Sequence, residues 1–221
     1  YDNPNSNADI LLKLGSLCNL LNEYSQAEYY LLESIYCGHT SKNILFELGL
    51  SYGGQKKYLQ ALITLQEALK YSLDDSILHY QIGVVYQEML IYDLAIKSYQ
   101  VYAQSNNNDP IVYRLIGNCY KNLANFQDAI INYKKAYNLY DYDDINTLYN
   151  LGFCYLSIKD YNNAAKYFKS IIRINPDHPD THHNLITTYL ELNKFKEAKK
   201  ECDILFMLDR DLYYSNSFCS K

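Results

Sequence analysis

Apolar and polar residues alternate along this chain with the spacing of amphipathic helices. A representative stretch has apolar residues at Leu148, Leu151, Tyr155, Ala164, Ala165, Phe168 and Ile171. A polar segment, SIKDYN at 157–162, separates the first three from the rest. The pattern predicts two helices joined by a short turn.

The same skeleton recurs along the chain with a period of 34 or 35 residues. Glycines stand at positions 15, 49, 83, 117 and 152. Three residues after them come Cys18, Tyr52, Tyr86, Tyr120 and Tyr155. Nine residues after them come Tyr24, Tyr58, Tyr92, Phe126 and Tyr161, and twelve after them Ala27, Ala61, Ala95, Ala129 and Ala164. A sixth copy lacks the glycine and reads Ile186, Tyr189, Phe195 and Ala198. Columns in register over six copies indicate a repeat architecture.

These columns resemble the tetratricopeptide repeat, a helix–turn–helix unit of 34 residues. With the glycine numbered as slot 8, the family's Tyr at slot 11 and Ala at slot 20 are matched in most copies. Its aromatic residue at slot 24 is matched in three, at Tyr99, Tyr133 and Phe168, and its proline at slot 32 only by Pro176. The resemblance covers residues 8–212 and implies an all-α fold, a right-handed superhelical solenoid of antiparallel helix pairs. The chain is then one array, residues 1–221, with copies near 8–41, 42–75, 76–109, 110–144, 145–178 and 179–212. Residues 213–221 are expected to form a capping helix or to begin a further repeat.

The glycine column predicts close packing between the two helices of each copy. A glycine within a helix costs about 1 kcal/mol relative to alanine, so close helix–helix approach must offset this cost. We expect the alanine at slot 20 to be the small partner from the second helix. Ile186 should then splay the sixth helix pair or mark a copy near the end of the array. The one extra residue of the fourth copy falls in or near 140–146, where a loop accepts it.

The resemblance implies that the first helices of the pairs line a concave groove through slots 2, 5, 9, 12 and 13. Many residues at slots 5 and 9 are apolar or aromatic, as expected of a surface that binds a partner helix or an extended peptide. The alternative is that neighbouring first helices cover them. The predicted groove residues are Leu12, Phe46, Leu50, Tyr80, Val84, Arg114, Asn118, Tyr149, Phe153 and His183.

Two ligand-binding patterns of the family are met only in part or not at all. The clamp for carboxylate-ended chaperone tails is matched at Arg114, Asn118 and Asn150, but Asp180 and Asn184 stand where it needs cations. An asparagine ladder at slot 6 is absent, since that slot reads Lys13, Glu47, Gln81, Leu115, Asn150 and Asn184.

Charge and hydropathy narrow the classes of partner. The net charge of −5 argues against a nucleic-acid partner, because binding phosphates depends on concentrated Lys and Arg. No apolar run approaches 18 residues, so we expect no membrane insertion.

The spacing of the cysteines and histidines indicates that these residues have structural roles. None of the six cysteines forms a C-x-x-C pair or has zinc-finger spacing. Free buried thiols in a reducing, intracellular compartment, cytoplasm or nucleus, are therefore expected, with Cys119 and Cys154 as small buried residues at slot 10. The group DHPDTHH at 177–183 reads as a loop plus one packed histidine, His182, rather than a metal site. We expect no cofactor.

The sequence therefore predicts a non-catalytic scaffold that binds a protein or peptide, with self-association left open. Because the chain begins with Tyr1 rather than Met, we expect a piece of a longer protein that works in a multiprotein complex. One alternative is a targeting module of an enzyme whose catalytic domain lies outside this chain. Another is a co-chaperone that binds chaperone tails.

Overall fold

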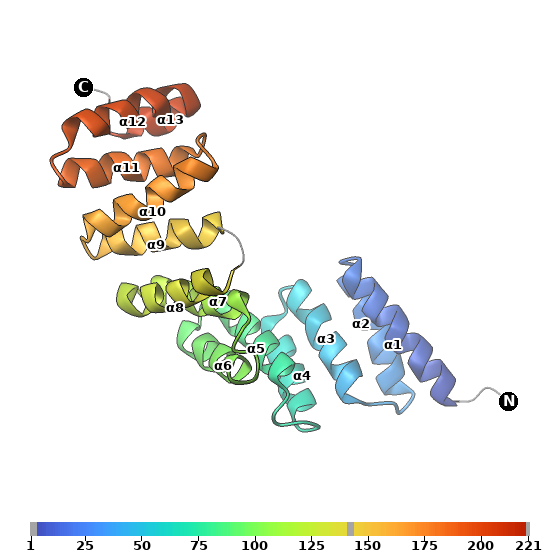
Figure 1. The fold of residues 1–221 in the computed structure, drawn as a ribbon. Coiled ribbons are helices and arrows are strands. Elements are labelled where there is room, and N and C mark those ends of the chain that lie inside the picture. Colours follow the sequence, from blue (N-terminus) through green and yellow to red (C-terminus); the bar gives the residue numbers. More distant parts are fainter. Residues whose placement is uncertain (1–3, 141–143, 220–221) are drawn as a thin grey trace. The chain divides into compact units, whose positions relative to one another are not determined.

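A computed structural model describes residues 4–140 and 144–219 of the chain. Within these ranges there are thirteen α-helices and no strand, which confirms the predicted all-α fold (Figure 1). The helices are α1 (Pro4–Leu20), α2 (Tyr24–Tyr36), α3 (Lys42–Gly54), α4 (Tyr58–Leu69), α5 (Ser76–Glu88), α6 (Tyr92–Ser105), α7 (Pro110–Asn122), α8 (Phe126–Leu139), α9 (Ile145–Ser157), α10 (Tyr161–Ile174), α11 (Pro179–Glu191), α12 (Phe195–Leu208) and α13 (Arg210–Ser215).

The chain divides into two compact units, Tyr1–Asn107 and Asn108–Lys221, which we call unit 1 and unit 2. Each unit contains three of the predicted copies, and each copy is one helix pair. Within a unit, every second helix also packs against the first helix of the next pair, as α2 does on α3 and α10 on α11. The extra residue of the fourth copy was placed in or near 140–146, which includes residues 141–143 outside the described ranges.

The turn within each pair has one conformation in all six copies. Slot 15 has a positive φ each time, at Asn22, Lys56, Leu90, Ala124, Lys159 and Asn193. The following N–H donates to the carbonyl of slot 11, as Ile91 does to Tyr86 at 2.9 Å. This left-handed residue with its long backward bond is a common way of ending a helix. None of the six is a glycine, so the glycine signal that usually marks such a turn is missing from the sequence.

The first helices of copies two to six begin at a side-chain cap. The cap accepts hydrogen bonds from the free N–H groups of the first turn, which would otherwise lack a partner. Asp75, for example, accepts from the N–H groups of Ile77 and Leu78. The capping residues are Ser41, Asp75, Asp109, Asp144 and His178.

The glycines at slot 8 make room for the side chain at slot 24 of the same pair. A Cβ on Gly152 would lie 2.5 Å from the ring of Phe168, and one on Gly83 would lie 2.7 Å from the ring of Tyr99. The other pairs are Gly15 with Leu31, Gly49 with Leu65, and Gly117 with Tyr133. The slot 20 alanines, which we expected to be the small partners from the second helix, are fully buried, but the atoms nearest to the glycines belong to slot 24.

In the sixth copy, the large residue is at slot 8 and the small one is at slot 24. Ile186 occupies slot 8, and slot 24 holds Cys202 in place of an aromatic residue or leucine. Both side chains are fully buried in the core of unit 2. A small residue at slot 24 therefore accommodates the large residue at slot 8. This copy is the last helix pair before α13, which agrees with our second reading of Ile186, a copy near the end of the array.

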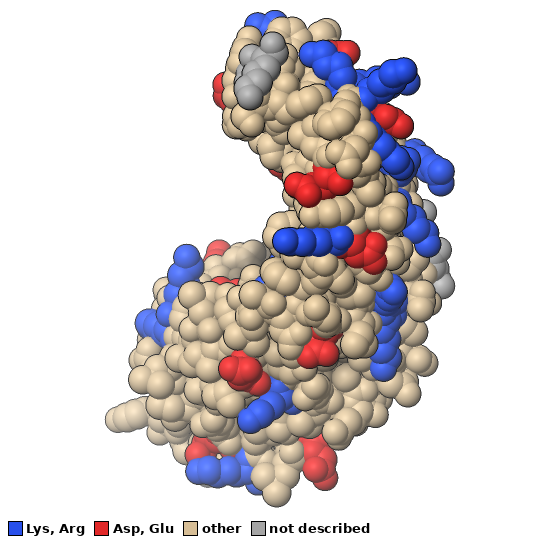
Figure 2. All heavy atoms as spheres, turned by 90° about the vertical axis from the view of Figure 1, so that its left-hand side faces the viewer, with Lys and Arg blue, Asp and Glu red and all other residues tan. Residues whose placement is uncertain are grey.

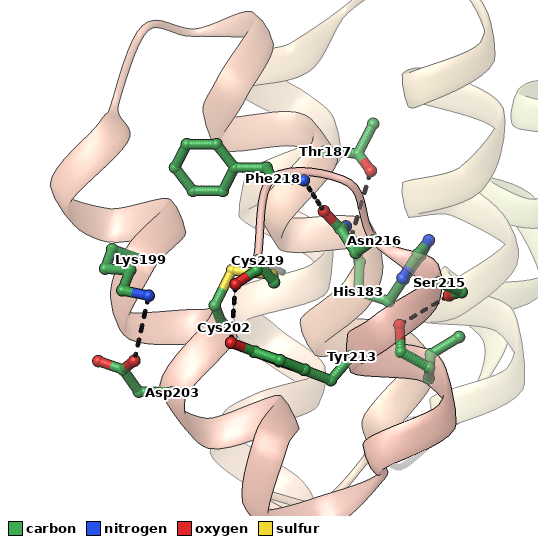
Figure 3. Close-up of a disulfide and its surroundings, with 11 residues drawn as sticks. His183, Thr187, Lys199, Cys202, Asp203, Tyr213, Ser215, Asn216, Phe218 and Cys219 are labelled. Carbon is green, nitrogen blue, oxygen red and sulfur yellow. Dashed lines mark hydrogen bonds and ion pairs between the residues drawn. A yellow bond between two sulfur atoms is a disulfide. The ribbon is translucent and has the colours of Figure 1, made fainter. Parts of the chain in front are cut away.

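The small residue at slot 24 also takes part in a disulfide. Cys202 bonds to Cys219 across a Cα–Cα distance of 5.4 Å, while the hydroxyl of Tyr213 donates to the carbonyl of Cys219 at 2.7 Å (Figure 3). Ahead of this tail, α13 packs against α11 and α12. The prediction of free buried thiols is wrong for this pair and for the exposed Cys37. The free and buried cysteines are Cys18, Cys119 and Cys154.

Glycine substitutions should distinguish the closely packed slot 8 positions from glycines that have free space around them. Gly152→Ala should lower the stability of the fold by about 1–3 kcal/mol, because its Cβ would overlap Phe168. Gly53→Ala is the control, since nothing lies within 4 Å of its Cβ position, and it should gain up to about 1 kcal/mol from helix propensity. Urea titration followed by circular dichroism measures both. Equal effects would contradict the packing of slot 8 against slot 24.

The disulfide leads to a second prediction, on thiol counts. Alkylation in denaturant without reductant should modify four cysteines, and all six after reduction, as read by intact-protein mass spectrometry. The bond joins residues separated by 17 positions, so Cys219→Ser should cost about 3 kcal/mol, whereas Cys37→Ser at an exposed site should change stability little. Modification of six cysteines without reductant would show that the bond is not formed.

Candidate functional site

Five predicted groove residues lie together on the first helices of unit 1. Leu12 is on α1, Phe46 and Leu50 are on α3, and Tyr80 and Val84 are on α5. All five side chains are partly exposed. We call this set the groove strip.

Three hollows in unit 1 each include one residue of the groove strip. A hollow of about 460 Å³ is lined by Leu12 with Ala8, Asp9, Ile44 and residues 38–41. A second, of about 330 Å³, is lined by Leu50 with Ser16, Asn19, Leu20, Tyr24, Glu47 and Gly54. A third, of about 150 Å³, is lined by Phe46 with Lys42, Asn43, Asp75, Ile77 and Leu78. The second and third hollows therefore combine an apolar wall with a few polar groups, as binding sites generally do, whereas the first is lined mainly by polar groups.

The polar groups beside the groove strip are held by hydrogen bonds. Asn19 donates from Nδ2 to Oε2 of Glu47 at 2.8 Å and accepts from the hydroxyl of Ser51 at 2.9 Å. The ammonium of Lys42 lies 2.7 Å from the carboxylate of Asp75. Burial alone would raise the pKa of Asp75, but hydrogen bonds from Lys42 and from the N–H of Leu78 hold that pKa below its ordinary value. These groups form a pre-organised polar margin next to the apolar surface.

Tyr80 is less available than the rest of the groove strip. Its ring centroid lies 5.0 Å from that of Tyr102 and 5.8 Å from that of Tyr99, both on α6. The second helix of its own pair therefore covers part of the ring. This cover comes from within the pair, so it differs from the alternative that we considered, which was cover by neighbouring first helices.

Unit 2 contains the other five predicted residues, and their surroundings differ. The ring of Tyr149 lies 6.0 Å from Phe168, in the arrangement that Tyr80 has in unit 1. Phe153 is partly exposed and its ring lies 6.3 Å from that of Phe126. His183 lies on α11, where its Nδ1 is buried.

The predicted polar residues of unit 2 bond to neighbouring side chains. Arg114 donates from Nε to the hydroxyl of Tyr140 at 3.3 Å. The amide oxygen of Asn118 accepts from the hydroxyl of Tyr133 at 2.7 Å and from Asn150 at 3.5 Å.

The asparagines at the clamp positions, Asn150 and the mismatched Asn184, form contacts between repeats. Lys121 donates to the amide oxygen of Asn150 at 2.8 Å, and burial lowers the pKa of this lysine. Asn184 donates to the hydroxyl of Tyr149 at 3.0 Å. These bonds join adjacent first helices, so the asparagines at slots 6 and 9 have a structural role.

Two exposed groove residues were missed by reading slots 5 and 9 alone. Leu20, at slot 13, is 81% exposed, and Ile77, at slot 2, is 57% exposed. Each lines one of the three hollows. Reading all five groove slots in every copy would have found both.

His182 is a packed histidine, as predicted. Its side chain is 1% exposed, with Nδ1 at 2.6 Å from the Glu201 carboxylate and Nε2 at 2.7 Å from the Pro176 carbonyl. Burial would lower the pKa of His182, but these two hydrogen bonds and the charges of Glu201 and Asp177 raise it above its ordinary value. Both ring nitrogens face acceptors, which favours the protonated ring.

In the described part of the chain, no three His, Cys, Asp or Glu side chains lie close enough together to hold a metal ion. Among the helices that the structure describes, none is long and apolar enough to cross a membrane. On the face in Figure 2, acidic side chains lie among the basic ones.

Comparison with known proteins supports the repeat assignment. The family model described as the tetratricopeptide repeat protein 21 C-terminal ARM domain matches residues 81–188. No curated protein matches the sequence. Its repeat columns and its helix pairs show that the chain has a helical repeat fold like that of tetratricopeptide repeat proteins.

Solved structures agree with this fold. The C-terminal part of a repeat-containing protein from Cytophaga hutchinsonii has a TM-score of 0.81 and 19% identity, covering 90% of this chain and 80% of that one. MamA from Desulfovibrio magneticus RS-1 has a TM-score of 0.71 and 21% identity, covering 77% and 96%. YrrB, described as a protein of this type with an unusual peptide-binding site, has a TM-score of 0.70 and 17% identity, covering 78% and 89%. At these identities the likeness shows the fold alone.

The buried histidine generates a prediction on pH. A raised pKa in the folded state means that the His182–Glu201 contact stabilises the protein fully below about pH 6.5, the ordinary histidine value. This stability is lost as the pH rises through the higher folded-state pKa. Urea midpoints measured from pH 6 to 9 should therefore fall. Glu201→Gln should flatten that fall, and an unchanged slope in this variant would contradict the assignment.

Proposed function

We propose that this chain is a non-catalytic scaffold that binds a peptide or an amphipathic helix of a partner protein along the groove strip of unit 1. The observation that carries the proposal is the set of three hollows along α1, α3 and α5. Partly exposed apolar side chains on successive helices suit a ligand that presents several anchors in a row.

The chemistry of the groove strip defines the ligand. The apolar residues Leu20, Leu50 and Phe46 would take aliphatic or aromatic anchors. The carboxylate of Glu47 and the Lys42–Asp75 pair stand beside them and would set the register of the ligand through polar contacts. We expect an apolar segment with alternating polar positions.

The wider setting is part of the same proposal. The chain is a section of a longer protein, acts inside the cell and contributes to a multiprotein complex. The buried free thiols at Cys18, Cys119 and Cys154 support an intracellular location, whereas the Cys202–Cys219 disulfide is unusual there. Thiol counting on protein taken directly from cells tests this location.

Two alternatives use the same fold. In the first, the groove strip positions an enzyme whose catalytic domain lies outside this chain, which the flanking sequence would reveal. The second, binding of chaperone tails in unit 2, is less favoured, because Asn118 and Asn150 are engaged in internal hydrogen bonds and two cations are missing.

The test is affinity capture with the chain as bait, followed by titration calorimetry with the captured partner. Leu20→Asp combined with Ile77→Asp places charge beside the groove strip at exposed sites. This variant should weaken binding at least tenfold, about 1.4 kcal/mol, with unchanged helicity by circular dichroism.

The matched control is Leu59→Asp combined with Ile63→Asp, two exposed apolar residues on α4. It should bind as the wild type does. Wild-type affinity in the groove variant, or loss of affinity in the control alone, would place the binding site elsewhere.

A further inference from the structure

The first helix of the array has an apolar face that is open. Ile10, Leu14 and Leu17 occupy slots 3, 7 and 10 of α1 and are 51%, 36% and 52% exposed. Their spacing of four and then three residues places them on one side of the helix. We call these three residues the end face, and none of them belongs to the groove strip.

The same three slots are covered elsewhere within each unit. In copy two they hold Ile44, Leu48 and Ser51, and in copy three Leu78, Ile82 and Val85, all at most 5% exposed. In copies five and six they hold Thr147, Leu151, Cys154, Thr181, Leu185 and Thr188, all at most 1% exposed.

The covering element in these four copies is the preceding helix pair. The contacts are those of α2 on α3, α4 on α5, α8 on α9 and α10 on α11. Copy three is the best comparison, since its three residues are all large and aliphatic, as they are in the end face. Within this chain, a surface of this kind is therefore covered by the preceding helix pair.

The last helix pair is covered by an element of its own chain, whereas the end face on the first helix is open. At the C-terminal end, α13 packs on α11 and α12, and the disulfide to Cys202 holds the tail there (Figure 3). A second copy could therefore not offer its last helix pair to the end face without displacing its own tail. Head-to-tail stacking of identical chains is thus disfavoured.

We propose that the end face is an interaction surface for a further helix pair of the same repeat type, stacked where a preceding repeat would lie. Such a pair brings an apolar second helix onto Ile10, Leu14 and Leu17 and buries them as copy two buries Leu78, Ile82 and Val85.

The probe for the test is the chain's own second repeat. Residues 42–75 are fused directly ahead of Ala8 in place of residues 1–7, which include the first four residues of α1. Asp75 then precedes slot 1 of copy one as it precedes slot 1 of copy three. Hydrogen exchange read by mass spectrometry should slow at least tenfold across residues 10–17 relative to the unmodified chain. Unchanged exchange in a folded fusion overturns the proposal.

Two variants of the fusion control for simple lengthening of the chain. Leu14→Asp with Leu17→Asp should abolish the slowing, whereas Leu20→Asp, on the same helix but in the groove, should leave it. Slowing that survives the first variant also overturns the proposal, because protection would then not come from the end face.

Two measurements on the unfused chain remain informative if the fusion fails to fold. Leu14→Asp with Leu17→Asp should leave the thermal midpoint within about 3 °C, since this face is open, and a larger fall means that the face is already covered. Light scattering should report a monomer. A dimer that these substitutions dissolve would make a second copy the occupant and overturn the proposal.

Discussion

Each helix pair depends on one close contact, between slot 8 of the first helix and slot 24 of the second. In five copies a glycine lies under a leucine or an aromatic ring, at distances that leave no room for a Cβ. This contact fixes the distance between the two helices. Slots 5, 9 and 12 follow the i, i+4, i+7 spacing of one helix face, so the same contact determines how the groove residues are presented.

The fold followed from the sequence because its signals are local and repeated. Helical periodicity, the glycine column and the copy boundaries can all be read from residue types alone. The reciprocal pair Ile186 and Cys202 could not be read in this way, because the partner of slot 8 is set by packing in three dimensions. The bond between Cys202 and Cys219 is similar, since its residues share no motif. The left-handed turn at Leu90 and Ala124 is formed without the glycine that would have signalled it.

The groove itself stays a prediction. Of the residues that the slots selected, Leu12, Phe46 and Leu50 line the hollows of unit 1. They could not show that Tyr80 and Tyr149 pack partly on their own second helices, since ring orientation depends on the neighbouring side chains. Exposure likewise depends on what covers a residue. The end face on α1 has the same residue types as buried positions in copy three and differs from them only in having no preceding repeat in the structure.

The central functional claim is that a partner binds along the first helices of unit 1. Methyl NMR of the Ile- and Leu-labelled chain, titrated with the binding segment of the captured partner, tests it most directly. The account predicts that the methyl resonances of Leu12, Leu20, Leu50 and Ile77 shift on binding, while those of Leu59 and Ile63 on α4 stay in place. Shifts confined to α4 and the other second helices, with the groove resonances unchanged, would contradict it.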